Sequence, residues 1–219
     1  MNAPQSMNEG ISRRIVVGIT GASGAAYAVR VIELLAERNV EVHVACSNLG
    51  KRLLAEEAGI TKLDADALSG GRGERLVMHP GNDVGAACAS GSFRHDGMVV
   101  VPASSNTLAK IAHGISDNLV QRAAQVTLKE RRPLVIAHRE SPIGLTEIEA
   151  MRKVTEAGAI VAPLAPGLYL QPKSVSDLID FMAGRLLDLL GVDHELPIRW
   201  DEHLAGQREK KADNRSTPR

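Results

Sequence analysis

Residues 15–24 read Ile15-Val16-Val17-Gly18-Ile19-Thr20-Gly21-Ala22-Ser23-Gly24, a β-branched run that ends in a cluster of small residues. The run predicts a buried strand over Ile15–Thr20, and the amphipathic stretch Gly24–Glu37 predicts a helix directly after it. Small residues in such a turn let backbone N–H groups approach an anion or an aromatic ring. A tight turn without a ligand is the alternative. The glycine spacing differs from the dinucleotide fingerprint and does not favour NAD.

The same alternation of short apolar runs and amphipathic stretches continues along the chain. Parallel strands joined by crossover helices give this pattern, and near-continuous apolar strands are typical of a sheet covered on both faces. The sequence therefore predicts an α/β fold. The predicted strands are Ile15–Thr20, Val40–Cys46, Leu76–His79, Met98–Val101, Leu134–His138 and Ala159–Ala162. The predicted helices are Gly24–Glu37, Asn48–Ala58, Asn106–His113, Asp117–Glu130, Thr146–Ala157 and Ser174–Leu190.

One domain accounts for most of the 219 residues. Residues 1–13 are polar and lack the apolar stretch of a signal peptide, so we expect a flexible segment there. The domain is expected over 14–206, followed by a polar, disordered tail at 207–219. The glycine- and charge-rich stretch Thr61–Arg75 predicts a surface excursion. No run approaches the ~18 apolar residues that cross a bilayer. We therefore expect a cytoplasmic protein with no membrane partner.

Charge and cysteine content narrow the classes of function. The 26 basic and 26 acidic residues cancel, whereas nucleic-acid-binding proteins usually carry a basic surplus, so we expect no nucleic-acid partner. Cys46 and Cys88 are expected to be free thiols. The sequence shows neither the histidine–glutamate pairing of a metalloprotease helix nor an Asp-Asp pair. We therefore predict no metal, and we interpret His43, His95 and His113 as surface or capping residues.

The predicted fourth strand also ends in hydrogen-bonding residues. Ser104, Ser105, Asn106 and Thr107 follow Pro102-Ala103 and open a helix. In open α/β sheets, ligands bind at the carboxyl ends of the strands. The run therefore predicts a phosphate cradle, with simple helix capping as the alternative.

Three basic residues and a tyrosine suggest a second anion site. Arg122 and Lys129 are seven residues apart, close to two helical turns, and share a face. Arg139-Glu140 follows the fifth strand, so these cations could bind a phosphate and offset its charge as it leaves. A solvated helix face is the alternative. Tyr169, in a proline-rich loop, could donate a hydrogen bond to a phosphate oxygen or simply pack within that loop.

Taken in order, these motifs resemble the pattern of the UbiX-type flavin prenyltransferases over about Arg14 to Trp200. The resemblance implies a doubly wound, Rossmann-like (flavodoxin-like) three-layer sandwich with a mainly parallel sheet. It also implies a homo-oligomer, often a dodecamer, with active sites between subunits. The motifs that carry it are Gly21-Ala22-Ser23-Gly24, Ala89-Ser90-Gly91-Ser92, Asp117-Asn118-Leu119, Arg122-Ala123-Ala124, Leu128-Lys129-Glu130-Arg131, Arg139-Glu140 and Pro166-x-x-Tyr169.

The resemblance also implies a reaction. A dimethylallyl group passes from dimethylallyl monophosphate, or from the pyrophosphate in some members, to N5 and C6 of reduced FMN without a metal. The prenylated FMN then serves a UbiD-type decarboxylase. Carried over by motif, the FMN-binding residues are Gly21, Ala22, Ser23, Ser47, Ser104, Ser105, Asn106, Thr107 and Arg139. The residues around the prenyl phosphate are Arg122, Lys129, Glu140, Tyr169, Arg185 and Trp200, and the catalytic residues are Ser23, Glu57, Lys129 and Glu140.

The sequence departs from the family pattern at three places. Ala103 stands where a cysteine is common, Leu168 replaces an aromatic residue, and Thr146-Glu147 replaces a frequent His-Leu. The first two changes touch the flavin and prenyl pockets and leave the donor open between monophosphate and pyrophosphate.

Two other functions fit parts of the sequence. An FMN-dependent cysteine decarboxylase would use a histidine on the approach to the fourth strand, where residues 88–92 contain none. An FMN-binding accessory or carrier subunit of a decarboxylase would keep the phosphate cradle. Such a subunit would not require Lys129, Glu140 or Arg185, so their joint presence favours catalysis.

Overall fold

A computed structural model of the protein describes residues 13–198. Strands and helices alternate along this part of the chain, as the sequence predicts. The strands are β1 (Arg14–Ile19), β2 (Glu41–Cys46), β3 (Leu76–His79), β4 (Gly97–Ala103), β5 (Leu134–His138) and β6 (Ile160–Val161). The helices are α1 (Ala25–Glu37), α2 (Asn48–Ala58), α3 (Ala65–Ser69), α4 (Ser105–Ala112), α5 (Leu119–Lys129), α6 (Leu145–Glu156) and α7 (Val175–Leu189).

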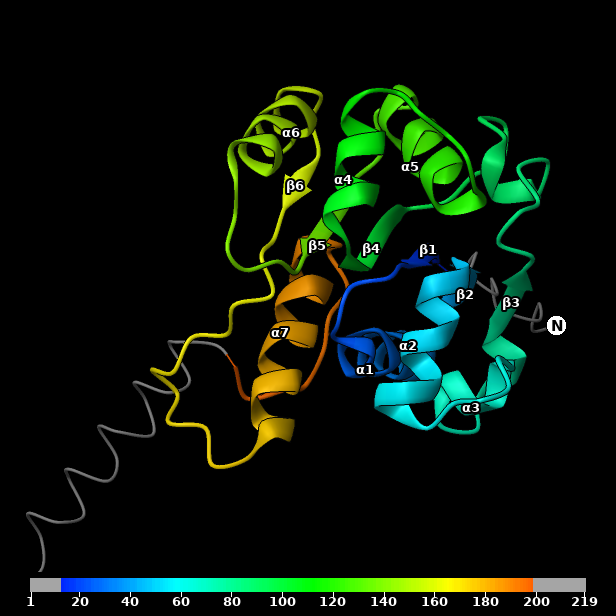
Figure 1. The fold of residues 1–219 in the computed structure, drawn as a ribbon. Helices are drawn as coiled ribbons and strands as arrows, with labels where there is room; N and C mark the ends of the chain where they lie inside the picture. Colours follow the sequence, from blue (N-terminus) through cyan, green and yellow to red (C-terminus); the bar gives the residue numbers. More distant parts are fainter. Residues whose placement is uncertain (1–12, 199–219) are drawn as a thin grey trace, which may run out of the picture.

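The six strands form one sheet in the order β3-β2-β1-β4-β5-β6, and every pair is parallel. Helices α1, α2, α3 and α7 cover one face, and α4, α5 and α6 cover the other (Figure 1). Strands β2 and β3 lie on one side of β1, and β4, β5 and β6 lie on the other side, so the strand order reverses between β1 and β4. The predicted doubly wound α/β fold is confirmed, with a sheet that is wholly parallel. The crevice at such a reversal is where α/β sheets bind ligands.

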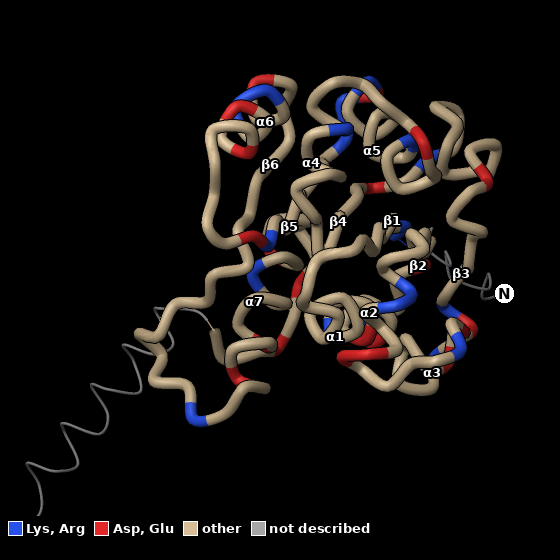
Figure 2. The backbone as a smooth tube through the Cα atoms, viewed as in Figure 1, with Lys and Arg blue, Asp and Glu red and all other residues tan. Residues whose placement is uncertain are grey.

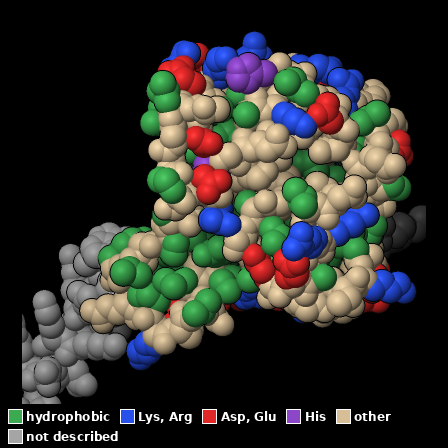
Figure 3. Space-filling view, viewed as in Figure 1, with side chains coloured by type: hydrophobic (Ala, Val, Ile, Leu, Met, Phe, Trp, Pro, Cys, Tyr) green, Lys and Arg blue, Asp and Glu red, His purple; other side chains and the backbone are tan. Residues whose placement is uncertain are grey.

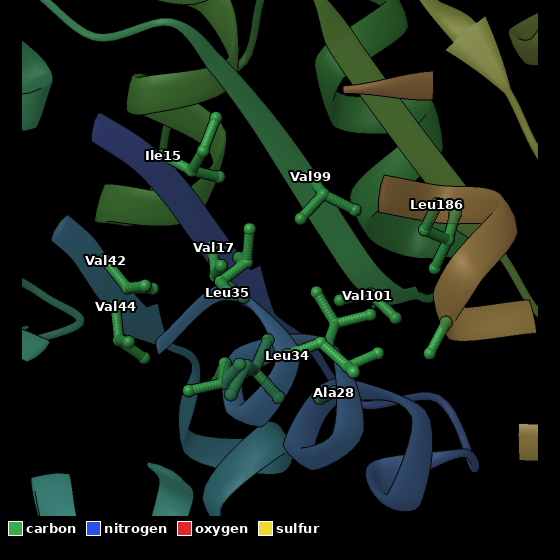
Figure 4. Packing of buried hydrophobic residues seen from close by; sticks show 14 of the residues in the cluster. Ile15, Val17, Ala28, Leu34, Leu35, Val42, Val44, Val99, Val101 and Leu186 are labelled. Atoms are coloured by element: carbon green, nitrogen blue, oxygen red, sulfur yellow. The ribbon is translucent and has the colours of Figure 1, made fainter. Parts of the chain in front are cut away.

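Aliphatic side chains fill both layers between sheet and helices. On one face, Val17 of β1 and Val99 of β4 pack with Leu34 and Leu35 of α1 and Leu186 of α7 (Figure 4). Burying each such side chain contributes about 1.5–3 kcal/mol. This packing fixes the positions of β1 and β4, and therefore of the segments that follow their carboxyl ends. No helix among residues 13–198 is long and apolar enough to cross a membrane.

Two local predictions are corrected. The stretch Thr61–Arg75 is not merely a surface excursion, because it contains α3 and because Leu68 is fully buried in the core. Asp64 caps this helix by accepting a hydrogen bond from the N–H of Ala67 at 2.8 Å. Strand β4 continues past Val101 to Ala103 although Pro102 has no N–H to donate. The carbonyl of Pro102 accepts hydrogen bonds from the segment after β1, which keeps the strand in the sheet.

The histidines also differ from expectation. His43 and His95 are only 5% and 7% exposed, so they are not surface residues. The Nδ1 atom of His43 lies 2.8 Å from Nε2 of His79, and its Nε2 lies 2.7 Å from Oε1 of Glu41. These two contacts, one from β3 and one from β2 itself, give both ring nitrogens of His43 a partner inside the protein. His113 is the C-cap residue of α4, as expected.

We expect the free energy of unfolding to fall as the pH drops from 7.5 to 5.5. Burial lowers the pKa of four rings below the ordinary histidine value of 6.5, those of His43, His79, His95 and His138. The unfolded chain therefore binds more protons than the folded chain below about pH 6.5, and stability present above that pH is lost as pH falls. Thermal unfolding midpoints at the two pH values test this. Equal midpoints would contradict it.

Both cysteines are free, as predicted, and the structure shows that both are buried. Burial raises the pKa of Cys46 to about 12 and that of Cys88 to about 11. A thiolate is the reactive form of cysteine, so both thiols are expected to be unreactive at neutral pH.

Candidate active site

A cavity of about 310 Å³ lies at the carboxyl edge of the sheet. Its wall comes from the segments that follow β1, β2, β3 and β4 and from the start of α5. Five residues expected to bind FMN line it: Gly21, Ser47, Ser104, Asn106 and Thr107. We call it the strand-end cavity; its other lining residues are Asn48, Leu49, Gly81, Asn82, Lys110, Asp117, Asn118 and Gln121. The sequence analysis therefore named lining residues in the segments that follow β1, β2 and β4.

Three helices begin at the strand-end cavity. Ser47, Ser104 and Asn118 are the N-cap residues of α2, α4 and α5. Each side chain accepts a hydrogen bond from the backbone N–H three residues further on, at 3.1, 3.3 and 3.1 Å. Helix N-termini carry partial positive charge and free N–H groups. The convergence of three helix N-termini favours an anionic ligand. Ser104 caps α4 and also lines the cavity, so helix capping and ligand binding do not exclude each other at this residue.

Sequence reasoning missed the contribution of the segment after β3. Gly81 and Asn82 line the strand-end cavity, and the carbonyl of Gly81 accepts a hydrogen bond from the N–H of Leu119 at 2.9 Å. This bond joins the end of β3 to the first residue of α5. The motif Asp117-Asn118-Leu119 signalled one side of the contact. Nothing in the local sequence singled out Gly81.

The turn after β1 holds an anion supplied by the chain itself. Oε2 of Glu57 accepts hydrogen bonds from the N–H groups of Gly24 and Ala25 at 2.8 and 2.9 Å. Partial burial tends to raise the pKa of Glu57, but these bonds, the Ser23 hydroxyl and Arg139 hold it below its usual value. Glu57 is therefore ionised beside Ser23. The N–H groups at the start of α1 bind this carboxylate, so an external anion at this turn would meet an occupied helix terminus.

A second group of expected residues gathers beside the cavity. Nε of Arg139 donates to the carbonyl of Ser23 at 3.1 Å, and Oγ of Ser105 donates to Oε2 of Glu140 at 3.2 Å. The basic and acidic residues follow the end of β5 next to one another (Figure 2). We call Ser23, Ser105, Arg139 and Glu140 the strand-tip cluster. Ala22 is buried in the same turn.

The remaining expected cations lie elsewhere in the single chain. Arg122 is half-buried in the second turn of α5, whereas Lys129 is exposed at its last residue. At 1.5 Å per residue, Lys129 is about 15 Å along the axis from the start of α5 at the cavity. It pairs with Glu130 and lies against Gly91. We call Gly91, Lys129 and Glu130 the Lys129 patch; it unites two of the motifs recognised in the sequence.

Arg185 and Tyr169 stand on a third part of the surface. Nη1 of Arg185 pairs with Oδ2 of Asp188 at 2.8 Å. The ring of Tyr169 packs edge-to-face on Phe181, with 5.6 Å between centroids, and Tyr169 is 46% exposed. Trp200 lies outside the described residues. The single chain therefore brings together the expected flavin residues but does not bring Lys129 or Arg185 to them.

The residues of the strand-end cavity suit FMN. Hydroxyl and amide side chains can bond to its phosphate, its ribityl chain and the polar edge of its ring, and the helix N-termini favour its charge. Among residues 13–198, no group of three or more histidine, cysteine, aspartate or glutamate side chains could hold a metal ion.

Comparisons with known proteins identify the family of this chain. A flavoprotein family model matches residues 3–187. A flavin prenyltransferase UbiX of Deinococcus radiodurans is 43% identical over 192 residues, which cover 88% of this chain and 95% of the relative. The structure of AnUbiX (PadA1) in complex with FMN and dimethylallyl pyrophosphate is 40% identical with a TM-score of 0.75, and the match covers 84% of this chain and 94% of that one.

A dodecameric FMN-dependent UbiX-like decarboxylase from Escherichia coli O157:H7 is 38% identical, with a TM-score of 0.76. The match covers 85% of this chain and 98% of that one. The relatives are thus spanned almost completely, and the resemblance found in the motifs is confirmed. This chain belongs to the UbiX-type flavin prenyltransferase family.

Proposed function

We propose that this protein transfers a dimethylallyl group from dimethylallyl monophosphate to N5 and C6 of reduced FMN. One observation carries the proposal. The strand-end cavity, where three helix N-termini converge, adjoins a cluster in which Arg139 is bonded to Ser23 and Ser105 to Glu140. The cavity suits a flavin phosphate, and the cluster offers a cation and a carboxyl group to a second phosphate. A protein that only stored FMN would need the first and not the second.

The chain's own residues supply the chemistry of the leaving group. Monophosphate leaves poorly near neutral pH, so Glu140 gives a proton to the departing phosphate oxygen while Arg139 offsets its negative charge. Reduced FMN supplies the nucleophilic atoms when it is bound. Ionised Glu57 orients the Ser23 hydroxyl and accepts, through it, a proton released as the new bonds form. No metal is required by this set of roles.

Assembly of several copies would complete the site. Lys129 and Arg185 pair with neighbours in their own helices or turns and stay away from the strand-tip cluster. Apolar side chains gather over the segment between β6 and α7 and the start of α7 (Figure 3), where Leu168 and Val175 are among the most exposed. We therefore propose a homo-oligomer, in the form of a dodecamer, in which the Lys129 patch and Arg185 come from other subunits. Arg122, Tyr169 and Trp200 belong to the same proposed prenyl-phosphate site.

The product needs a recipient. Prenylated FMN has no use in the reaction that forms it, so we propose that a UbiD-type decarboxylase in the cytoplasm accepts it. The proposed catalytic domain extends over residues 14–206, with segments 1–13 and 207–219 outside it.

Mass spectrometry of the flavin tests the proposed function. Reduced FMN incubated with the protein and dimethylallyl monophosphate should become heavier by one prenyl group, and the pyrophosphate should be tested in parallel. A reaction without prenyl donor is the control. Flavin that stays bound but keeps its mass with both donors would contradict the transferase and support an FMN carrier. Loss of carbon dioxide from a peptide cysteine would instead support a cysteine decarboxylase.

A further inference from the structure

His138, the last residue of β5, has no role in the function proposed above. His138 is only 2% exposed. It directly precedes Arg139 in the chain. Its carbonyl accepts a hydrogen bond from the N–H of Leu164 at 2.8 Å, and its register partner on β4 is Ala103. The backbone of His138 is therefore held on both sides. A buried imidazole in so fixed a place can act only on its immediate neighbours.

One neighbour links His138 to the strand-tip cluster. Nε2 of His138 lies 3.2 Å from Oγ of Ser105, and the same Oγ lies 3.2 Å from Oε2 of Glu140. A serine hydroxyl has one proton and two lone pairs. If its proton goes to the Glu140 carboxylate, Oγ is left to accept the N–H of the imidazole. With that proton directed to Glu140, the three groups form one directed chain of hydrogen bonds. The Glu147 carboxylate is a second acceptor within reach of the Ser105 hydroxyl.

Burial and the neighbouring charges determine the protonation state of the His138 ring. Burial lowers the pKa of His138, while Glu140 and Glu147 oppose this effect and Arg139 adds to it. Ser105, from α4, is the uncharged contact. The ring is thus neutral at neutral pH and has a single N–H, which the chain of bonds assigns to Nε2. With Glu140 protonated, the same three groups can bond in the reverse direction: the carboxyl donates to Ser105, and Ser105 donates to Nε2 of a ring that carries its proton on Nδ1.

We propose that His138 is a positioning residue for prenyl transfer, holding the Glu140 carboxyl in place through Ser105 in both of its protonation states. The inference rests on the proposed function, in which Glu140 gives a proton to the leaving phosphate. Proton transfer requires the carboxyl within hydrogen-bond reach of that oxygen. Few side chains besides imidazole can either donate to a hydroxyl or accept from it at the same atom.

Two substitutions at His138 separate positioning from packing. His138→Asn fills much of the space but its amide is too short to reach Ser105, whereas the amide of His138→Gln reaches about as far as Nε2. We expect His138→Asn to lower kcat about tenfold, the loss that one missing hydrogen bond gives. KM for dimethylallyl monophosphate and the amount of FMN retained should stay within about twofold, because no contact to either is lost. His138→Gln should recover most of kcat.

His95→Gln is the matched control, because His95 is also buried but lies just before β4, at the amino ends of the strands. It should leave kcat unchanged. Nitrogen-15 spectra of the imidazoles in the flavin-free protein give a readout independent of turnover, and the signal that disappears in His138→Asn identifies His138. Wild-type protein should show the Nε2–H tautomer near pH 7, and Ser105→Ala should abolish that preference.

The outcomes are distinct. Unchanged kcat in His138→Asn, or a tautomer that does not respond to Ser105→Ala, would contradict the inference while leaving the proposed function intact. Wild-type protein that transfers no prenyl group would contradict the proposed function, and the inference with it. An equal fall of kcat in His138→Gln would show that a hydrogen bond to Ser105 from position 138 does not restore turnover, which also contradicts the inference.

Discussion

Glu140→Gln should retain FMN yet form prenylated FMN roughly 10²- to 10⁴-fold more slowly than the wild type, the usual contribution of a positioned acid. Glutamine keeps the shape of the side chain and can accept the hydrogen bond from Ser105, which spans 3.2 Å in the wild type. It has no acidic proton to give to the phosphate. Single-turnover mass spectrometry measures the rate, and the flavin absorbance of the purified variant measures FMN retention.

The donor provides an internal check on this loss. Pyrophosphate leaves more readily than monophosphate, so Glu140→Gln should lose less activity with the pyrophosphate if that donor is accepted at all. Glu149→Gln is the control, since Glu149 is an exposed residue of α6 that pairs with Arg152. Near-normal turnover in Glu140→Gln with monophosphate would remove the role of proton donor from Glu140.

Gly81→Ala is expected to lose most of its affinity for FMN. A Cβ atom at this position would lie 2.1 Å from the carbonyl oxygen of Cys46, a backbone atom that cannot rotate away. The segment after β3 must therefore shift. Because Gly81 lines the strand-end cavity and bonds to the N–H of Leu119, the shift moves both a wall of the cavity and the start of α5. We expect the Kd for FMN to rise more than about tenfold, or 1.4 kcal/mol.

Fluorescence titration of the flavin-free protein with FMN measures this change, and thermal unfolding reports the cost of overpacking, about 1–3 kcal/mol. Gly85→Ala serves as the control. A Cβ at Gly85 would lie 3.4 Å from Oδ1 of Asp83, an ordinary contact. If Gly81→Ala bound FMN as tightly as Gly85→Ala, the segment after β3 would not belong to the flavin site.

The periodicity of apolar residues predicted most strands and helices of the fold but not the contacts between them. Strands such as Leu134–His138 were predicted to the residue because continuous burial gives a continuous apolar run. Helix α7 was equally clear, since Ser174 and Asp177 form the capping box that the sequence indicated. Helix α3 was missed because it has only five residues, of which Leu68 and Ser69 are buried. Its helical state depends on contact with α1, which local sequence does not encode.

The candidate site was predictable where a strand end carries its own polar run. Ser104 and Thr107 were identified for this reason, and they do line the cavity. Gly81 and His138 were not, because their importance comes from what lies opposite them: a carbonyl of β2 and a hydroxyl of α4. The approach of Glu57 to the N-terminus of α1 also joins segments more than thirty residues apart. A motif indicated Glu57 as a site residue but not the contact that holds it.

The lengths of the two outermost strands have a consequence for handling the protein. β3 has four residues and β6 only two, whereas the four strands between them have five to seven. An edge strand with few unpaired backbone groups is a poor template for a strand from another molecule. Concentrated solutions of the folded protein should therefore resist fibril formation that begins by strand addition at either border of the sheet.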